Sequence, residues 1–237
     1  MLELTIEGDG SKKLNFEVQK LVNAGRSARD ITNVRKHMEE LRKTGITIPD
    51  EFPIFNLVTP ERITTGDHFE VLMNSKTSGE VEFVLLLDNG NVYVSVGSDH
   101  TDRELQKTNK VAAKQIYYNV IAPTVWRFED VKEYWDDLIM RSWVQEKGQR
   151  QLYQEGKLVE MLRPEKLIEE VNSRVTGGLS GMVIFSGTLP TLSGELSYSS
   201  RFDMELIDER AGRAIKHTYF AEPITWFKGK WNDSWGL

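Results

Sequence analysis

The sequence predicts an α+β fold that contains more sheet than helix. Most apolar segments alternate apolar and polar positions with the two-residue period of a strand, or are short and rich in β-branched residues. Turn-forming dipeptides such as Asn89-Gly90 separate several of these segments, and only a few segments repeat apolar residues at helical spacing. We therefore expect sheets accompanied by a few helices.

The first predicted elements are a hairpin and a helix. Residues 2–6 and 14–18 alternate as strands do, and Gly8-Asp9-Gly10 supplies the turn between them. Between residues 27 and 43 the apolar residues recur at helical spacing, and Gly45 is suited to end a helix. This segment is predicted to be an amphipathic helix.

The rest of the chain continues this mixture. A short helix is expected to begin near Asp102, and further helices are predicted at residues 131–147 and 165–171. Strands are predicted at residues 69–73, 80–87, 92–98, 182–186 and 201–207. Because no repeat or linker-like segment divides the sequence, we expect a single domain over residues 1–237.

The composition is that of a globular protein. Hydrophobic residues make up 39% and charged residues 28% of the chain, and a net charge of -6 gives no broad attraction to nucleic acid or an anionic membrane. The absence of cysteine excludes disulfides, thiolate metal sites and a cysteine nucleophile. The N-terminus does not resemble a signal peptide and no apolar run has membrane-spanning length, so a cytoplasmic protein is expected.

The turn at Asn89-Gly90 fixes the register of a predicted hairpin. This dipeptide is preferred in two-residue type I′ turns, because both turn positions need a positive φ. If Asp88 pairs with Asn91, each residue a given number of positions before Asp88 lies opposite the residue the same number of positions after Asn91. The register then determines which side chains are neighbours.

Three acidic residues come together in this register. Glu80 lies opposite Asp99 and Glu82 lies opposite Gly97, all on one face. The other face carries alternating apolar residues, namely Val81, Phe83, Leu85, Leu87, Val92, Val94 and Val96. Directly opposed Cβ atoms are about 5 Å apart, so a bound cation would relieve the repulsion among the carboxylates. An all-oxygen site suits Mg²⁺, Mn²⁺ or Ca²⁺ better than zinc. Gly97 is expected to leave room for the ion or a ligand.

The alternative is an exposed, solvated strand face, and the segment after the hairpin bears on the choice. Thr101 and Glu104 have capping-box spacing, so a helix is expected to start directly after Asp99. Arg103 and Gln106 are three residues apart and share one face of that helix. Both could hydrogen-bond a carboxylate or carbonyl on a bound cation, which favours the metal site.

With these residues, the chain resembles the fumarylacetoacetate hydrolase superfamily from about residue 23 to about residue 194. That family has an E-x-E on one strand and an aspartate ending another, followed by an arginine and a glutamine four and seven positions later. The matching residues are Glu80, Glu82, Asp99, Arg103 and Gln106. The resemblance implies a β-rich fold of mixed β-sandwich or β-roll type with a few short helices, and a divergent branch of the superfamily.

Two further segments carry the resemblance. Lys114, followed by Pro123, is similar to the family's Lys-Ser-Phe-like segment, and GMVIFSGTLPTLSG is similar to its G-D-x-I-x-T-G-T-P-x-G-x-G stretch. The second match places Gly187 and Thr188 at the substrate-binding turn. Leu189 interrupts the family pattern, which points to a different substrate pocket.

The resemblance also implies a reaction. Members bind a 2-oxo acid or 1,3-dicarbonyl compound on a divalent cation, which for this chain is expected to be Mg²⁺ or Mn²⁺, with Ca²⁺ as the alternative. The expected activity is hydrolysis of a C–C bond in an acylpyruvate-like oxo acid through a metal-bound enolate. Lys114, Arg103 and Gln106 would hold the developing charge. Oxo-acid decarboxylation, tautomerisation and sugar-acid dehydration use the same chemistry and remain open, as does a non-catalytic small-molecule-binding protein.

Two more expectations concern water activation and assembly. The family carries a His-x-x-Glu pair on a lid helix, and His37 with Glu40 matches it, with three-residue spacing that places both side chains on one helix face. The alternative is an ordinary amphipathic helix with a boundary histidine. A homodimer is expected from the resemblance and from the C-terminal tryptophans Trp226, Trp231 and Trp235.

Overall fold

The computed structural model describes residues 1–8, 12–30 and 52–226, and ten strands of these segments form the larger sheet. Eight strands follow one another in the order β2-β1-β12-β9-β8-β15-β3-β4, and β11 joins β9 and β5. Their bounds are β1 Leu2–Ile6, β2 Lys12–Phe16, β3 Lys20–Gly25, β4 Ile54–Val58, β5 Ile63–Thr64, β8 Val81–Asp88, β9 Asn91–Asp99, β11 Asn119–Ile121, β12 Thr124–Arg127 and β15 Met182–Phe185.

A second sheet has the order β14-β13-β16-β17-β6, and a two-stranded sheet pairs β10 with β7. Their bounds are β6 His68–Val71, β7 Thr77–Ser78, β10 Thr101–Asp102, β13 Ile139–Glu146, β14 Gln149–Lys157, β16 Arg201–Asp208 and β17 Arg213–Pro223. Within the described residues the α-helices are α2 Arg103–Gln106, α3 Lys110–Gln115 and α4 Pro164–Asn172, with 3-10 turns η1 Pro60–Arg62, η2 Phe128–Asp130, η3 Lys132–Asp137 and η4 Leu158–Glu160. The predicted β-rich fold class is confirmed.

The larger sheet is strongly curled. Asn119 of β11 donates a 2.7 Å hydrogen bond to Asn23 of β3, although three strands lie between β11 and β3 in the sheet. In a flat sheet these strands would be about 19 Å apart, since neighbours are spaced by about 4.8 Å. The two ends of the sheet therefore curl toward one another and enclose an interior.

Both faces of the central strand β8 are buried. Phe83 and Leu85 belong to the core between the curled sheet and the second sheet, whereas Val84 and Leu86 belong to a second core inside the curl. The expectation that one face of the hairpin holds only the acids is therefore wrong for the half near the turn. The acids occupy only the end of this face that is farthest from the turn.

The hairpin has the predicted register. Asp88 pairs with Asn91 and Glu82 pairs with Gly97, and both turn residues have positive φ, 47° at Asn89 and 82° at Gly90. Because the turn residues set the register locally, sequence alone was sufficient here.

The helix predictions have mixed outcomes. Helix α4 confirms the prediction at 165–171, but residues 131–147 form the turn η3 and the strand β13, which pairs with β14 and β16. Of the helix predicted at 27–43, residues 31–43 lie outside the described residues, and Ala28 forms an isolated bridge to Met161. None of the described helices is long and apolar enough to cross a membrane.

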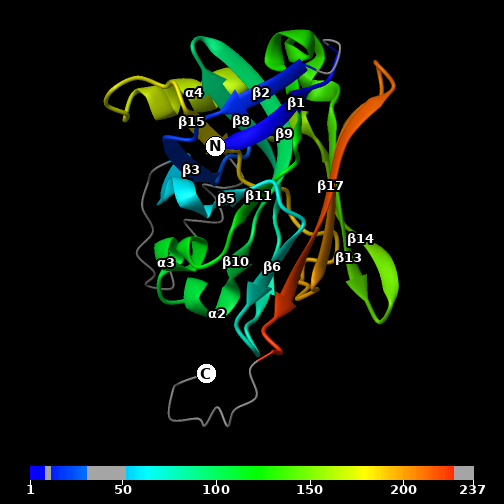
Figure 1. The fold of residues 1–237 in the computed structure, drawn as a ribbon. Coiled ribbons are helices and arrows are strands. Elements are labelled where there is room, and N and C mark those ends of the chain that lie inside the picture. The colour runs from blue at the N-terminus through cyan, green and yellow to red at the C-terminus, as the bar shows by residue number, and fades with distance from the viewer. Residues whose placement is uncertain (9–11, 31–51, 227–237) are drawn as a thin grey trace.

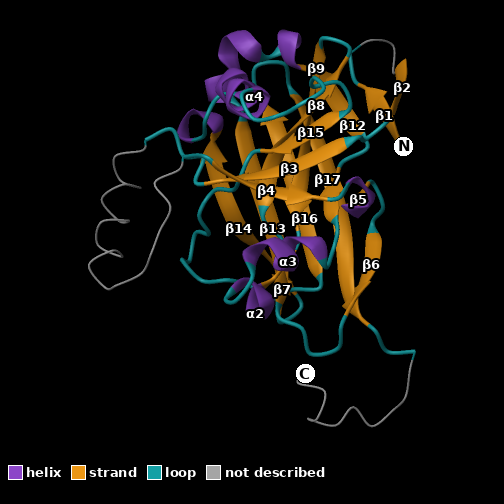
Figure 2. Cartoon of the chain, turned by 90° about the vertical axis from the view of Figure 1, so that its left-hand side faces the viewer, coloured by secondary structure: helices purple, strands orange, loops and turns teal. Residues whose placement is uncertain are grey.

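The helices mark the two ends of the molecule. Helix α4 lies at one end, and α2 and α3 lie at the other, next to the short strands β7 and β10 (Figure 1, Figure 2). Strands β8 and β9 run between these ends, so the acidic residues at the start of β8 and the end of β9 lie near α2 and α3. This end of the curled sheet holds the candidate site.

Candidate metal centre

Three carboxylates meet at the end of the hairpin. One oxygen of each of Glu80, Glu82 and Asp99 lies within 4.8 Å of the others. Glu82 and Asp99 are buried and Glu80 is partly exposed, with the Asp99 amide donating to the Glu80 carbonyl. The arrangement follows from the hairpin register, because side chains two residues apart share a face. Three carboxylates at this spacing have the donor chemistry of a site for Mg²⁺, Mn²⁺ or Ca²⁺.

Two cationic side chains contact these acids. Helix α3 directs the buried Lys114 so that its ammonium group bonds Asp99 and lies 3.6 Å from Glu80. From α2, Arg103 donates a 3.1 Å hydrogen bond to Glu80 and another of 3.1 Å to Gln106. The acids are thus only partly neutralised by the protein itself.

The ionisation of the acids reflects this balance. Burial raises the pKa of Glu82 well above its ordinary value, and the nearby charge of Asp99 raises it further. Burial alone would raise the pKa of Glu80, but Lys114 and Arg103 lower it. Burial alone would lower the pKa of Lys114, but Asp99 and the two glutamates raise it. The unfavourable ionisation of Glu82 fits a site completed by a cation, whose charge would offset the repulsion.

Arg103 is held behind the acids. Its Nε donates a 2.6 Å hydrogen bond to Ser78 Oγ, and its side chain is 5% exposed. The helix that positions it begins with Asp102, whose carboxylate accepts hydrogen bonds from the amides of Glu104 and Leu105. The prediction that Thr101 caps this helix is therefore wrong by one residue, and the Thr101 hydroxyl donates to Asp99 instead.

A loop after β15 closes the site from the other side. The Gly187 amide donates a 2.7 Å hydrogen bond to Glu82. Gly187 has a φ of 82°, and a Cβ there would lie 2.3 Å from Ser27 Oγ, so only glycine fits. Thr188 donates to the Val81 carbonyl and accepts from Gln154, which fixes the loop against β8 and β14.

A buried polar network supports Glu80 from the opposite face of the hairpin. The Glu80 amide donates to Ser98 Oγ, which is 2.8 Å from the Tyr219 hydroxyl, and His100 Nδ1 is 2.9 Å from the same hydroxyl. A Cβ on Gly79 would lie 2.5 Å from this hydroxyl, so a glycine is needed where β17 approaches the hairpin. His100 thus belongs to this network and not to the acidic cluster.

Glu80 and Glu82 of the acidic cluster open into a cavity of about 230 Å³. Gln106, Lys110, Lys114 and Thr188 line it together with Glu80 and Glu82. Gly97 does not leave this space open, contrary to expectation, because a Cβ there would meet Val84 and Phe185 at 2.6 and 2.7 Å. The glycine is instead required by the packing of the core inside the curl.

Comparison with known proteins places the chain in a family. Residues 24–219 match the family described as "Protein of unknown function (DUF2848)". The chain belongs to this family. No curated protein matches the sequence.

Solved structures share the fold of this DUF2848 protein. Yeast ynq8, a fumarylacetoacetate hydrolase family protein, is 18% identical with a TM-score of 0.60, covering 90% of this chain and 97% of that one. A 2-keto-3-deoxyarabinonate dehydratase is 16% identical with a TM-score of 0.63, covering 88% and 75%. A Yersinia pestis CO92 protein provisionally assigned to the fumarylacetoacetate hydrolase family is 17% identical with a TM-score of 0.61, covering 93% and 100%. The predicted resemblance is confirmed at the level of the fold.

The structure of this DUF2848 protein brings most of the predicted site residues together. Glu80, Glu82, Asp99, Arg103, Gln106, Lys114, Gly187 and Thr188 all line the cavity or contact a residue that does. The predicted pair His37 and Glu40 lies outside the described residues. Sequence reasoning missed Lys110, although its spacing of four residues from Lys114 is visible in the sequence, and the Asn23–Asn119 contact, which only the curl creates.

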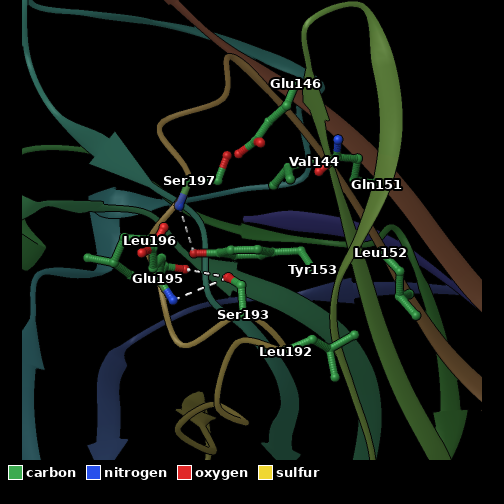
Figure 3. Close-up of a pocket in the computed structure, with 10 residues that line it drawn as sticks. All are labelled: Val144, Glu146, Gln151, Leu152, Tyr153, Leu192, Ser193, Glu195, Leu196 and Ser197. Carbon is green, nitrogen blue, oxygen red and sulfur yellow. Dashed lines mark hydrogen bonds between the residues drawn. The ribbon is translucent and has the colours of Figure 1, made fainter.

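A second cavity of about 400 Å³ lies between the β13–β14 hairpin and residues 192–197 (Figure 3). Tyr153 reaches into it, and its hydroxyl accepts a 3.2 Å hydrogen bond from the Ser197 amide (Figure 3). Glu146 and Glu195 also line it, but none of the predicted site residues does. This cavity is distinct from the acidic one.

Proposed function

We propose that this protein is a divalent-cation-dependent enzyme that hydrolyses a C–C bond in a small oxo acid of the acylpyruvate or 1,3-diketo acid type. The observation that carries the proposal is the convergence of Glu80, Glu82 and Asp99 beside a cavity that Glu80, Glu82 and Lys114 line. These acids would hold Mg²⁺ or Mn²⁺, and Ca²⁺ has the same donor preference. When bound, the cation supplies a Lewis acid that stabilises negative charge on carbonyl oxygens beside the bond that breaks.

The chain's own residues orient the substrate and hold charge. Lys114 stays protonated because three carboxylates raise its pKa, so it can donate a hydrogen bond to an oxygen that becomes negative. Gln106 lines the cavity, and its Oε1 already accepts from Arg103, which leaves its NH₂ group to donate to a substrate carboxylate or carbonyl. Arg103 orients Glu80 and Gln106 in this scheme, since its nitrogens bond those two side chains and Ser78.

Water activation is assigned to His37 and Glu40 on the sequence pattern and the family resemblance. A carboxylate that holds the imidazole in one orientation allows it to accept a proton from water. In the hydrolysis, the water oxygen joins the acyl carbon, the C–C bond breaks, and a proton is delivered to the carbon released with the oxo acid. An acylpyruvate would thus give a carboxylic acid and pyruvate.

Dehydration of a sugar acid is the second candidate function. It is favoured by the cavity lining, where the side chains of Asn56, Gln106 and Thr188 suit a hydroxylated substrate. A 2-keto-3-deoxyarabinonate dehydratase shares the fold, but a likeness at 16% identity does not transfer its activity. Decarboxylation and tautomerisation of oxo acids use similar charge stabilisation.

Product analysis distinguishes these reactions. The purified protein is incubated with Mg²⁺ or Mn²⁺ and, separately, acetylpyruvate, oxaloacetate and a 2-keto-3-deoxy sugar acid, and the products are identified by NMR. Acetate and pyruvate in equal amounts from acetylpyruvate would support the hydrolase. If acetylpyruvate is not cleaved, carbon dioxide released from oxaloacetate would support a decarboxylase instead of the hydrolase. A dehydrated product from the sugar acid would in that case support a dehydratase. No turnover of any substrate, with metal shown to bind, would contradict an oxo-acid enzyme of these classes.

A further inference from the structure

Lys110 is an additional cation at the cavity that Glu80 and Glu82 line. It lies at the first position of α3, four residues before Lys114, and both lysines line the cavity. Residues four apart lie on the same face of a helix. Lys114 is buried against the acids, whereas Lys110 is exposed and about 6 Å farther along the helix axis.

The position of Lys110 is unfavourable for the helix itself. A cation at the N-terminal end of a helix opposes the helix dipole, and two lysines at i and i+4 repel one another. Within the described part of the chain, no carboxylate forms an ion pair with Lys110 that would compensate. By contrast, the nearby exposed Lys107 is paired with Glu104 at 2.7 Å. A residue that breaks local preferences without local compensation is a candidate for a functional role.

The charges around the cavity indicate the charge of the ligand group that Lys110 would contact. Lys114 and Arg103 leave one negative charge among the three acids, which a divalent cation reverses to one positive charge. Lys110 adds a second positive charge at the outer part of the cavity. A ligand with one carboxylate leaves this charge unmatched, whereas a ligand with two carboxylates matches it.

We propose that Lys110 is a specificity-determining residue that binds a distal carboxylate of the substrate, so that the site selects short-chain oxo dicarboxylates over oxo monocarboxylates. This inference rests on the proposed function, because the oxo-acid end of the ligand must occupy the inner part of the cavity. The distal carboxylate lies on the side of α3 nearest its N-terminus. Lys110 acts on selection among substrates and does not take part in bond cleavage.

A matched pair of ligands tests this assignment. 2-Oxoglutarate and 2-oxopentanoate have the same carbon chain and differ only in a distal carboxylate in place of a methyl group. Their binding to the Mg²⁺-loaded protein is measured by calorimetric titration, for the wild type, Lys110→Met and the control Lys107→Met. The wild type and the control should bind 2-oxoglutarate about five- to tenfold more tightly than 2-oxopentanoate. Lys110→Met should remove this preference by weakening 2-oxoglutarate alone.

The outcomes separate this inference from the proposed function. If both ligands bind the wild type equally, or if Lys110→Met keeps the preference, the role of Lys110 is overturned while oxo-acid binding stands. If neither ligand binds although Mg²⁺ does, the oxo-acid function fails and the inference fails with it. Lys110→Glu tests whether the preference depends on the sign of the charge at this position, since this variant should favour 2-oxopentanoate over 2-oxoglutarate.

Discussion

The backbone amide of Gly187 donates a 2.7 Å hydrogen bond to the carboxylate of Glu82. This bond attaches the loop after β15 to an acid whose ionisation is unfavourable in its buried position, and it acts against that effect by lowering the pKa. The loop is therefore part of the electrostatic support of the acidic cluster.

Gly187→Ala should weaken both the fold and metal binding. A Cβ at this position would lie 2.3 Å from Ser27 Oγ, and a φ of 82° strains alanine, so a loss of about 1–3 kcal/mol in the free energy of unfolding is expected. Gly194→Ala is the matched control, because Gly194 has a φ of 76° but open space at its Cβ. Equal effects of the two variants on denaturant unfolding and on Mg²⁺ titration would contradict this role.

Glu82→Gln and Asp99→Asn should each abolish detectable Mg²⁺ and Mn²⁺ binding while the fold remains intact. Each change keeps the shape of the side chain but removes one of three converging charges. Calorimetric titration measures the affinity and circular dichroism monitors folding. Glu195→Gln, in the second cavity, serves as the control and should bind the metal as the wild type does. Unchanged metal affinity in both cluster variants would exclude this site.

Lys114→Met should have opposite effects on metal affinity and catalysis. The ammonium group contacts Asp99 and Glu80, where it competes with a cation for the same carboxylates, so its removal should tighten Mg²⁺ binding. The turnover number on an accepted substrate should fall by about 10²- to 10³-fold, because a donor to the developing charge is lost. A variant that binds Mg²⁺ more weakly would show that Lys114 supports the metal instead of competing with it.

His37→Ala and Glu40→Gln should each lower kcat on an accepted substrate by about 10²- to 10⁴-fold, as expected for loss of a general base or of the group that orients it. Metal affinity should be unaffected. Glu39→Gln is the control, since it changes the neighbouring acid that the family pattern does not include. The assignment is wrong if both variants turn over substrate at the wild-type rate.

Buried His100 predicts a pH dependence of stability. Burial lowers the pKa of His100 to about 3, with a smaller effect from the charge of Arg103, whereas the unfolded chain takes up this proton near pH 6.5. The unfolded state therefore binds a proton that the folded state does not bind between these values. The free energy of unfolding should fall with decreasing pH from about 6.5 to 3, with a slope contribution approaching about 1.4 kcal/mol per pH unit.

His100→Phe should remove this contribution, and His68→Gln, which alters an exposed histidine, should retain it. Urea unfolding at pH 7 and pH 4.5 gives the comparison, because the carboxylates titrate alike in all three proteins. If His100→Phe loses as much stability on acidification as the wild type, the histidine does not remain neutral in the fold.

The features that depend only on residues close together in the sequence are the ones that the sequence predicted correctly. The Asn89-Gly90 turn determines the pairing of Glu82 with Gly97 because the register follows from the turn geometry alone. Helix α4 was likewise predictable, with Pro164 at its start and a buried apolar stripe. In both cases the decisive residues lie within one element or one turn of each other.

Long-range contacts explain the errors. Residues 139–146 have apolar positions compatible with a helix, but pairing of β13 with β14 and β16 on both edges makes them a strand. The space over Gly97 is filled by Val84 and Phe185, and Phe185 comes from a strand almost 90 positions later in the sequence. The place of Lys110 at the cavity depends on where α3 lies relative to β8, which the sequence around Lys110 does not determine.

The contact between Asn23 and Asn119 has a consequence for how the cavity responds to its contents. Next to Asn23, Ala24 and Gly25 of β3 line the same cavity as Glu82 of β8 and Lys114 of α3. A ligand that fills the cavity therefore contacts parts of the chain that the curl of the sheet brings together, and its binding should favour the curled state by mass action. Ligand binding and folding of the curled sheet are thermodynamically linked in this way.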